Sequence, residues 1–245
     1  MRPFPWFAIV LVAIAAVAAA QQASFQTDTI KTASGDLQTS FLGHSSLMFR
    51  YGEAVVHVDP VSQYGDYAAL PKADLILVTH EHGDHLDVKA IEAVRKDTTI
   101  IIGTAKCAAQ VPGMTVMGNG ETRTVGALRI EAVPAYNVVN TRPTGEPFHA
   151  KGDGNGYVIT FGDKRVYIAG DTENVPEMKA LKNIDIAFLP MNLPYTMTPE
   201  MVADAAKAIA PRILYPYHYG NTEMSKLVSL LANERGIELR IRNLK

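Results

Sequence analysis

Cysteine and clustered positive charge are both scarce in this sequence. Cys107 is the single cysteine among 245 residues, so an intrachain disulfide is excluded and stability must come from packing, helped by any bound metal. There are 23 lysines and arginines against 25 aspartates and glutamates, without a basic cluster. A nucleic-acid partner is therefore disfavoured, because proteins that follow a phosphate backbone need such clusters. The sequence implies no protein partner and leaves the oligomeric state open.

The amino-terminal 20 residues are nearly free of charge. Arg2 is followed by an uninterrupted apolar run that ends in Ala18–Ala20, an order typical of a secretory signal peptide. An uncleaved membrane anchor is the alternative, since a span needs roughly 20 apolar residues. Prolines near the start and small residues at the end favour cleavage. We therefore expect a periplasmic or secreted protein in which residues 1–20 are the signal peptide and residues 21–35 a loosely held polar arm.

The chain from residue 36 to residue 245 is expected to form one domain. Short runs of β-type residues follow one another closely, many of them bounded by Gly, Pro, Asn or Asp. The expected strands are 37–42, 46–51, 54–59, 73–79, 98–102, 114–117, 127–133, 156–161, 165–170, 185–190, 212–217 and 237–242. Helices are expected in three places, after Asp87, from Thr198-Pro199 to Ile209, and from Met224 up to Gly236. This pattern predicts an α/β fold of four layers, with two sheets face to face and helices outside.

Residues 80–85 read His-Glu-His-Gly-Asp-His and contain three of the seven histidines. They follow the apolar strand 73–79, whose end would let His80 and His82 turn towards one point. Imidazole suits zinc, and a carboxylate beside another histidine, as in Asp84-His85, suits a second and harder site. Gly83 is expected to supply the sharp turn between the two pairs. A surface loop with a chance cluster of histidines is the disfavoured alternative.

This segment resembles the H-x-H-x-D-H signature of the metallo-β-lactamase superfamily. GHSS (43–46), HVDP (57–60), IAGDTE (168–173) and YPYHYG (215–220) lie where that family has its other landmarks. The resemblance covers nearly the whole chain from about residue 36, and is closest to the bacterial branch that resembles ascorbate-6-phosphate lactonase and N-acyl phosphatidylethanolamine phospholipase D. It implies the αβ/βα sandwich with metals at one edge.

The resemblance also implies two metal ions that share one carboxylate. Asp171 corresponds to the bridging carboxylate, and His218 to the last ligand of the second metal. Asp59 resembles the acid that accepts the other N–H of a ligand histidine, although an Asp-Pro turn explains it equally well. The remaining implied ligands are His80 and His82 for the first metal, and Asp84 and His85 for the second. Zinc is the expected metal, with manganese or iron as alternatives.

The sequence departs from the family at one ligand. A third histidine normally follows the strand that here reads ALRIEAVPA, but this chain has Tyr136-Asn137 there. In a first interpretation, His149 in the following loop replaces the missing ligand. In a second, water or Tyr136 fills the gap, and in a third, His149 belongs to a substrate lid. We favour the first interpretation, because four-coordinate zinc needs a third neutral ligand and no other candidate is present.

Four further residues have two interpretations each. His44 could contact substrate, although a hydrogen-bonded turn histidine is somewhat favoured. Asn137 could contact substrate or support a ligand. Tyr195 and Met197 could line the cleft or pack in the core. His57, between two valines in a strand, is expected to be structural.

The resemblance implies hydrolysis by a metal-bridging hydroxide, with Asp84 holding the second metal and orienting the water. The expected target is an ester, lactone or phosphodiester bond of a small-molecule or lipid-like substrate. An iron-dependent oxidoreductase on the same fold is one alternative. A metal- or ligand-binding protein whose first site has decayed is another, suggested by Tyr136.

Overall fold

Runs of valine, isoleucine and leucine form the strands of two seven-stranded sheets in the computed structural model, which describes residues 25–244. The first sheet follows chain order and comprises β1 (Gln26–Thr32), β2 (Gly35–Gly43), β3 (Ser46–Tyr51), β4 (Ala54–Val58), β5 (Leu75–Leu77), β6 (Ile100–Gly103) and β7 (Thr115–Val116). The second has the order β14-β13-β12-β11-β10-β9-β8 and comprises β8 (Thr122–Val125), β9 (Leu128–Ala135), β10 (Gly154–Phe161), β11 (Lys164–Ile168), β12 (Ile186–Pro190), β13 (Ile213–Tyr217) and β14 (Glu238–Leu239).

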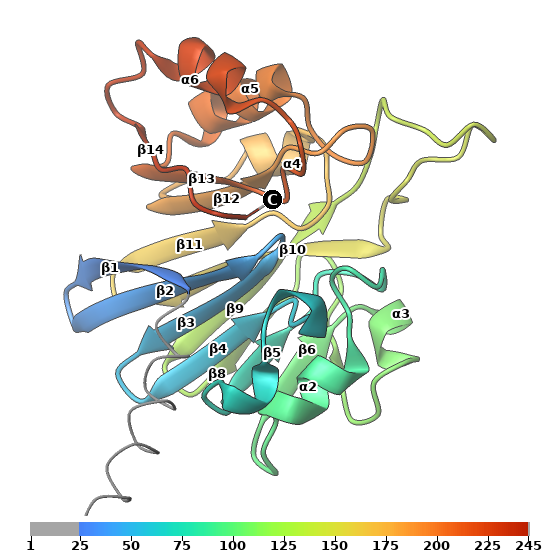
Figure 1. The fold of residues 1–245 in the computed structure, drawn as a ribbon, viewed down its shortest axis with the longest axis vertical. Helices are drawn as coiled ribbons and strands as arrows, with labels where there is room; N and C mark the ends of the chain where they lie inside the picture. The colour runs from blue at the N-terminus through green and yellow to red at the C-terminus, as the bar shows by residue number, and fades with distance from the viewer. Residues whose placement is uncertain (1–24, 245) are drawn as a thin grey trace, which may run out of the picture.

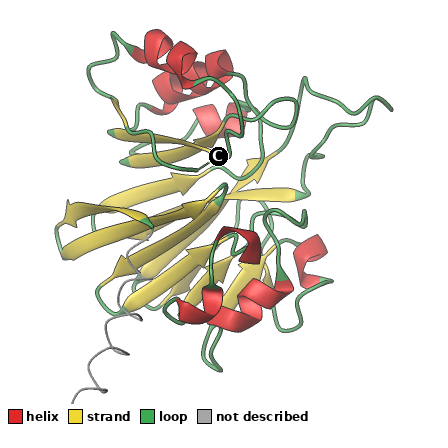
Figure 2. Ribbon diagram, viewed as in Figure 1, coloured by secondary structure: helices red, strands yellow, loops and turns green. Residues whose placement is uncertain are grey.

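Helices cover the outer faces of both sheets (Figures 1 and 2). Side chains from the two sheets share one core, in which the rings of Phe49 and Phe161 lie 5.5 Å apart. The order of layers is therefore helix, sheet, sheet, helix, which confirms the predicted sandwich. The helical segments are η2 (Ser62–Tyr64), η3 (Tyr67–Ala69), α2 (Val88–Val94), α3 (Ala105–Ala108), α4 (Pro176–Lys179), α5 (Pro199–Ile209) and α6 (Met224–Leu231).

The central strands of each sheet end at the same edge of the sandwich. In the first sheet β4, β5 and β6 run parallel, and in the second β11, β12 and β13 do. Open α/β sheets bind ligands outside the carboxyl ends of such strands. The segments that follow β4, β5, β11 and β13 carry Asp59, His80, Asp171 and His218. The two sheets thus bring four of the predicted site residues to one edge.

Local signals identified the central elements correctly. Every strand expected between residues 37 and 217 is present, as are the three expected helices. The Asp87 side chain accepts hydrogen bonds from the amides of Lys89 and Ala90 at the start of α2, as expected of an N-cap. Two boundaries differ. The final strand, expected over 237–242, is reduced to β14, and α6 ends at Leu231 rather than continuing to Gly236.

The structure corrects the expectation that residues 21–35 form a loosely held arm. Residues 26–32 are strand β1, which pairs antiparallel with β2 along its whole length. Asp28 accepts hydrogen bonds from Arg242 and from the hydroxyl of Tyr215. Burial opposes ionisation of Asp28, but these partners outweigh it and lower the pKa of its carboxyl. Hydrophobic periodicity misses this strand because backbone pairing and an ion pair hold it.

The predicted signal peptide and the first residues of the expected arm lie outside the described residues. Within residues 25–244, none of the helices combines the length and the apolar character that crossing a membrane requires.

His57 makes stability depend on pH at a site separate from the histidine cluster. Its ring is fully buried, and Nε2 donates to the carbonyl of Pro71 at 3.0 Å. Burial lowers the pKa of His57 to about 4. Between that value and the ordinary 6.5, the unfolded chain binds a proton that the folded chain does not. The folded state is therefore destabilised as the pH falls through this window, by up to about 3 kcal/mol.

Replacing His57 with glutamine should remove this pH dependence. Glutamine keeps a donor for the Pro71 carbonyl but does not titrate. We expect the free energy of unfolding of His57→Gln to fall less than that of the native protein between pH 6.5 and pH 4, measured by urea denaturation of the metal-free forms. Parallel curves for the two proteins would show that His57 does not titrate as its burial indicates.

Candidate metal centre

The loop of residues 80–85 is separated from β5 by Val78 and Thr79 and turns back on itself. The amides of His85 and Leu86 both donate to the carbonyl of His82, at 3.0 and 2.8 Å. Gly83 does not have a positive φ, and a Cβ placed on it would meet no atom within 4 Å. The expectation that this turn needs glycine is therefore wrong. Hydrogen bonds to His82 close it, and another residue would fit at position 83.

Three imidazoles converge at one side of the centre. His80 Nε2 lies 3.1 Å from His82 Nδ1, which lies 3.3 Å from His149 Nε2. His149 comes from the loop between β9 and β10, 67 residues further along the chain. His80 and His149 are buried, whereas His82 is partly exposed. The structure thus brings His149 to the position that the favoured interpretation requires.

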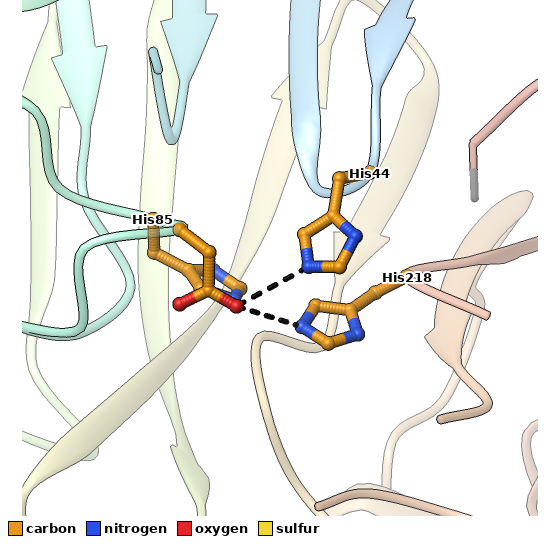
Figure 3. A group of neighbouring side chains, drawn as sticks. His44, His85 and His218 are labelled. Atoms are coloured by element: carbon orange, nitrogen blue, oxygen red, sulfur yellow. Dashed lines mark hydrogen bonds and ion pairs between the residues drawn. The ribbon is translucent and has the colours of Figure 1, made fainter. Parts of the chain in front are cut away.

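A second group lies beside the first. His85 and His218 each turn Nε2 towards the carboxylate of Asp84, at 3.9 and 3.5 Å. His44, in the turn between β2 and β3, lies 3.2 Å from the same carboxylate oxygen. Figure 3 shows His44, His85 and His218 approaching one another from three separate segments of the chain. His44 therefore contributes more directly to the centre than the sequence indicated.

Asp171 lies between the two groups. Its Oδ2 is 3.4 Å from Nε2 of His149 and 3.9 Å from Nε2 of His80, on the first side. On the second side, Oδ2 is 3.4 Å from His218 Nε2, and Oδ1 is 3.2 Å from His85 Nε2. One buried carboxylate therefore contacts ligand atoms of both groups, as the resemblance implied for a bridging residue.

These donor atoms fit two metal ions. Four ligands about 2.0–2.1 Å from zinc lie roughly 3.3–3.4 Å from one another in a tetrahedron. The distances within each group, from 3.1 to 3.9 Å, are close to that value. Within residues 25–244, four buried atoms of the centre have no hydrogen-bond partner, namely His85 Nε2, Asp171 Oδ1 and both ring nitrogens of His218. Buried polar atoms are rarely left unpaired, so these atoms are consistent with metal ligation.

Burial and neighbouring charge set the protonation of the ligand groups. Burial lowers the pKa of His149 to about 4, which leaves a neutral imidazole at pH 7. Burial opposes ionisation of Asp171, but His218 and His85 outweigh it and hold the pKa of this carboxyl well below its usual range. Burial also opposes ionisation of Asp84, but the neighbouring imidazoles of His218 and His44 outweigh it and lower the pKa of this carboxyl. Metal binds neutral imidazoles and ionised carboxylates, so it must displace a proton from His85, whose pKa is raised well above its usual value because Asp171 and Asp59 outweigh the effect of burial.

Asp59 has the position expected of a supporting acid. Its Oδ2 lies 2.7 Å from Nδ1 of His85, and it is fully buried. The amide and hydroxyl of Thr79 donate to the two oxygens of Asp59, at 2.8 and 2.7 Å. The carboxylate thus accepts the Nδ1 proton of His85, which leaves Nε2 to face the centre. An Asp-Pro turn alone would not account for this contact.

Backbone strain is concentrated at the centre. His44, Asp59 and His218 have φ values of 52°, 44° and 47°, in the left-handed region that non-glycine residues seldom adopt. The amide of His218 donates to the carbonyl of His44 at 3.1 Å, which joins two of these strained residues. Gly170 has a φ of 67°, and a Cβ there would lie 2.8 Å from the carbonyl oxygen of Asn155. Only glycine fits before Asp171.

Tyr136 is directed away from the ligand groups. Its hydroxyl donates to Glu177 at 2.9 Å, and its ring lies under the ammonium of Lys151. The interpretation in which Tyr136 fills the vacant ligand position is therefore disfavoured. Asn137 instead accepts a hydrogen bond from Nδ1 of His149 at 2.8 Å. Asn137 thus supports a ligand.

A cleft of about 450 Å³ opens onto the centre. Tyr195 lines this cleft as expected, whereas Met197 is buried in the core. Arg142 and Phe148 also line the cleft, but no sequence pattern indicates them, because both lie in a long loop without periodicity. Thr79 and Glu173 were missed as well. Their only signal was their place beside His80 and Asp171.

Known proteins resemble this chain in sequence. The family described as β-lactamase superfamily domain matches residues 38–218. A UPF0173 metal-dependent hydrolase from Methanopyrus kandleri is 32% identical over 196 residues, which cover 75% of this chain and 84% of the relative. A relative of the same description from Thermus thermophilus is 30% identical over 216 residues, covering 82% of this chain and 94% of its own.

Solved structures with a similar fold include two that are described as metal-dependent hydrolases. A protein from Parabacteroides distasonis, provisionally described as a metal-dependent hydrolase, has a TM-score of 0.86 and 52% identity, covering 90% of this chain and 100% of its own. Igni18, a metallo hydrolase from Ignicoccus hospitalis, has a TM-score of 0.70 and 21% identity, covering 85% of this chain and 95% of its own. The second likeness concerns the fold alone.

Proposed function

This chain belongs to the metallo-β-lactamase superfamily of metal-dependent hydrolases, and we propose that it uses two metal ions to cleave an ester, lactone or phosphodiester bond. The observation that carries the proposal is the contact of Asp171 with both ligand groups. A carboxylate in that position can hold two ions close together, the arrangement used for displacement at a carbonyl or phosphoryl centre.

Each ion has its own protein ligands in this proposal. His80, His82 and His149 hold the first, and Asp84, His85 and His218 the second, with Asp171 shared between them. Three imidazoles with one carboxylate favour zinc in the first position. Two ions of this kind, when bound, lower the pKa of a water molecule and polarise the bond to be cleaved.

Asp84 differs from the other proposed ligands in its access to solvent. Its side chain is 45% exposed and lines the cleft, whereas that of Asp171 is buried. His44 donates to Oδ2 of Asp84 and fixes the orientation of the carboxylate. We propose that Asp84 accepts a hydrogen bond from the attacking water and so aims its lone pair at the substrate.

The cleft suits a substrate that combines an anionic and an apolar part. Phe148 and Tyr195 form an edge-to-face pair with ring centroids 5.1 Å apart. The guanidinium of Arg142 lies 5.1 Å from the Phe148 ring at the same cleft. We propose that the rings contact an apolar group and that Arg142 contacts a phosphate or carboxylate. A small-molecule or lipid-like ester fits this description.

Export remains part of the proposal. The signal-peptide pattern of residues 1–20 supports a periplasmic or secreted enzyme, and the absence of any disulfide requirement is compatible with either compartment.

Metal removal followed by reconstitution tests the proposed function. Protein stripped with a chelator is loaded separately with zinc, manganese or iron and assayed against a lactone, a nitrophenyl ester, bis-nitrophenyl phosphate and a phospholipid. We expect the stripped protein to be inactive and two zinc ions per chain to restore turnover of at least one substrate. Two bound zinc ions without turnover of any of them, or activity confined to the iron form with consumption of oxygen, would contradict the proposal.

A further inference from the structure

Three side chains form a chain of hydrogen bonds that connects a buried carboxylate with the first ligand group. Glu173 Oε1 accepts a hydrogen bond from Nδ2 of Asn137 at 3.3 Å. Asn137 Oδ1 accepts from Nδ1 of His149 at 2.8 Å, and Nε2 of His149 faces His82. All three are buried. Among the hydrogen bonds of residues 25–244, the side chains of Glu173 and Asn137 reach the proposed ligands only through His149.

The neighbours of Asn137 determine which way its amide points. Nδ2 lies between the Glu173 carboxylate and the carbonyl oxygen of Tyr195, at 3.3 and 2.9 Å, and both are acceptors. Oδ1 faces the backbone N–H of His149 at 2.9 Å, which can only donate. The reverse orientation would place donor against donor and acceptor against acceptor. The amide orientation is therefore unambiguous.

This orientation also selects the tautomer of His149. Asn137 Oδ1 can only accept, so Nδ1 of His149 carries the proton and the lone pair lies on Nε2. We propose that Asn137 is a positioning residue for His149, held by Glu173, and that it sets the affinity of the first metal site by fixing this tautomer and ring angle. The inference rests on the proposed function, in which His149 is a ligand.

Glu173 holds the loop as well as the amide. Its Oε2 accepts from the backbone amides of Val138 and Val139 at 2.8 and 2.7 Å, and its Oε1 accepts from that of Asn140 at 2.7 Å. These three amides follow Asn137 directly. A single carboxylate therefore fixes the start of the loop that carries His149, which reduces the conformational entropy lost when a metal binds.

Replacing Asn137 with alanine tests the role of the amide. We expect Asn137→Ala to weaken metal binding at the first site about 10–100-fold, the usual effect of losing a residue that supports a ligand histidine. Binding at the second site should not change. Cobalt titration of the metal-free protein measures both affinities. Asn140→Ala is the matched control, because Asn140 also donates its side-chain amide across to the 192–197 loop, at the Thr196 carbonyl, but does not contact His149.

The tautomer provides a readout that loss of stability alone would not change. Long-range nitrogen-15 correlation spectra of the metal-free protein at neutral pH should show His149 protonated at Nδ1 in the native protein and in Asn140→Ala. Asn137→Ala should show a mixture of the two tautomers. Asn137→Asp keeps the acceptor, so we expect it to restore the Nδ1–H form. In this variant the new carboxylate faces that of Glu173, and we expect their repulsion to lower the melting temperature without changing the tautomer.

The outcomes separate this inference from the proposed function. An unchanged tautomer and unchanged first-site affinity in Asn137→Ala would refute the positioning role. Equal weakening in Asn137→Ala and Asn140→Ala would also refute it, since a general loosening of the loop would then explain both. If the native protein shows the Nδ1–H tautomer but binds no metal at the first site, the chain of hydrogen bonds exists and the assignment of His149 as a ligand fails.

Discussion

Asp171→Asn is expected to weaken metal binding at both sites and to abolish turnover. Asp171 is the shared contact of the two ligand groups, and asparagine preserves its shape while removing its charge. Four-ligand zinc sites bind with about 10–16 kcal/mol, so one ligand supplies roughly 3–4 kcal/mol. This corresponds to a loss of affinity on the order of 10²–10³-fold at each site. Elemental analysis after dialysis at fixed free zinc measures the metal per chain.

Asp84→Asn is the control for this prediction. Asp84 contacts His44, His85 and His218 but belongs to no group with His80 or His149. Its loss should therefore weaken the second site alone and leave one metal per chain where Asp171→Asn leaves none. If Asp171→Asn keeps one tightly bound ion, the carboxylate serves a single site and the bridging role is wrong.

The parts of the fold that sequence patterns predict are those whose stability is hydrophobic and local. β3, β5 and β12 are nearly continuous runs of buried apolar residues, and their positions follow from composition. β1 has no buried side chain and is held by pairing with β2 and by the ion pair of Asp28 with Arg242. That ion pair joins residues 214 positions apart, so no local pattern reports it.

The residues of the candidate site also differ in how well the sequence predicts them. Four of the proposed ligands lie within residues 80–85, where density alone reveals them. Asp171 and His218 required the resemblance, because a single aspartate or histidine after a strand is common. His149 followed from the absence of the usual histidine at 136–137. His44 was underrated, since its approach to Asp84 depends on how the β2–β3 turn meets the other sheet.

The support around the ligands could not have been predicted. Asn137 is one of the two residues, Tyr136-Asn137, that stand where the resemblance implies a ligand histidine, and its contact with His149 spans 12 residues of irregular loop. Glu173 follows Asp171 by two positions, which suggests that it lies near the centre. This spacing does not predict the four hydrogen bonds that Glu173 accepts. Loops carry no periodicity from which such contacts can be inferred, so these contacts are seen only in the structure.

His149→Ala is expected to remove one metal and leave the other. The first group would keep His80, His82 and Asp171, and its affinity should fall on the order of 10²–10³-fold by the same division of about 10–16 kcal/mol among four ligands. Turnover should be lost, because the two-metal arrangement that stabilises both the attacking and the leaving oxygen would be missing. Thr144→Ala, an exposed change in the same loop, should retain two ions and full activity.

Added imidazole decides between a ligand role and a lid role for His149. If His149 is a ligand, its removal leaves a space beside His82 that free imidazole can fill, so millimolar imidazole should restore the second ion and part of the turnover. If the residue only closes over the substrate, His149→Ala should keep two ions and raise KM, and imidazole should have no effect. We expect the first result, because His149 Nε2 already lies 3.3 Å from His82 Nδ1 and 3.4 Å from Asp171 Oδ2. It would show that a loop residue has replaced the histidine missing at 136–137. The second would leave the first ion with two imidazoles and one carboxylate.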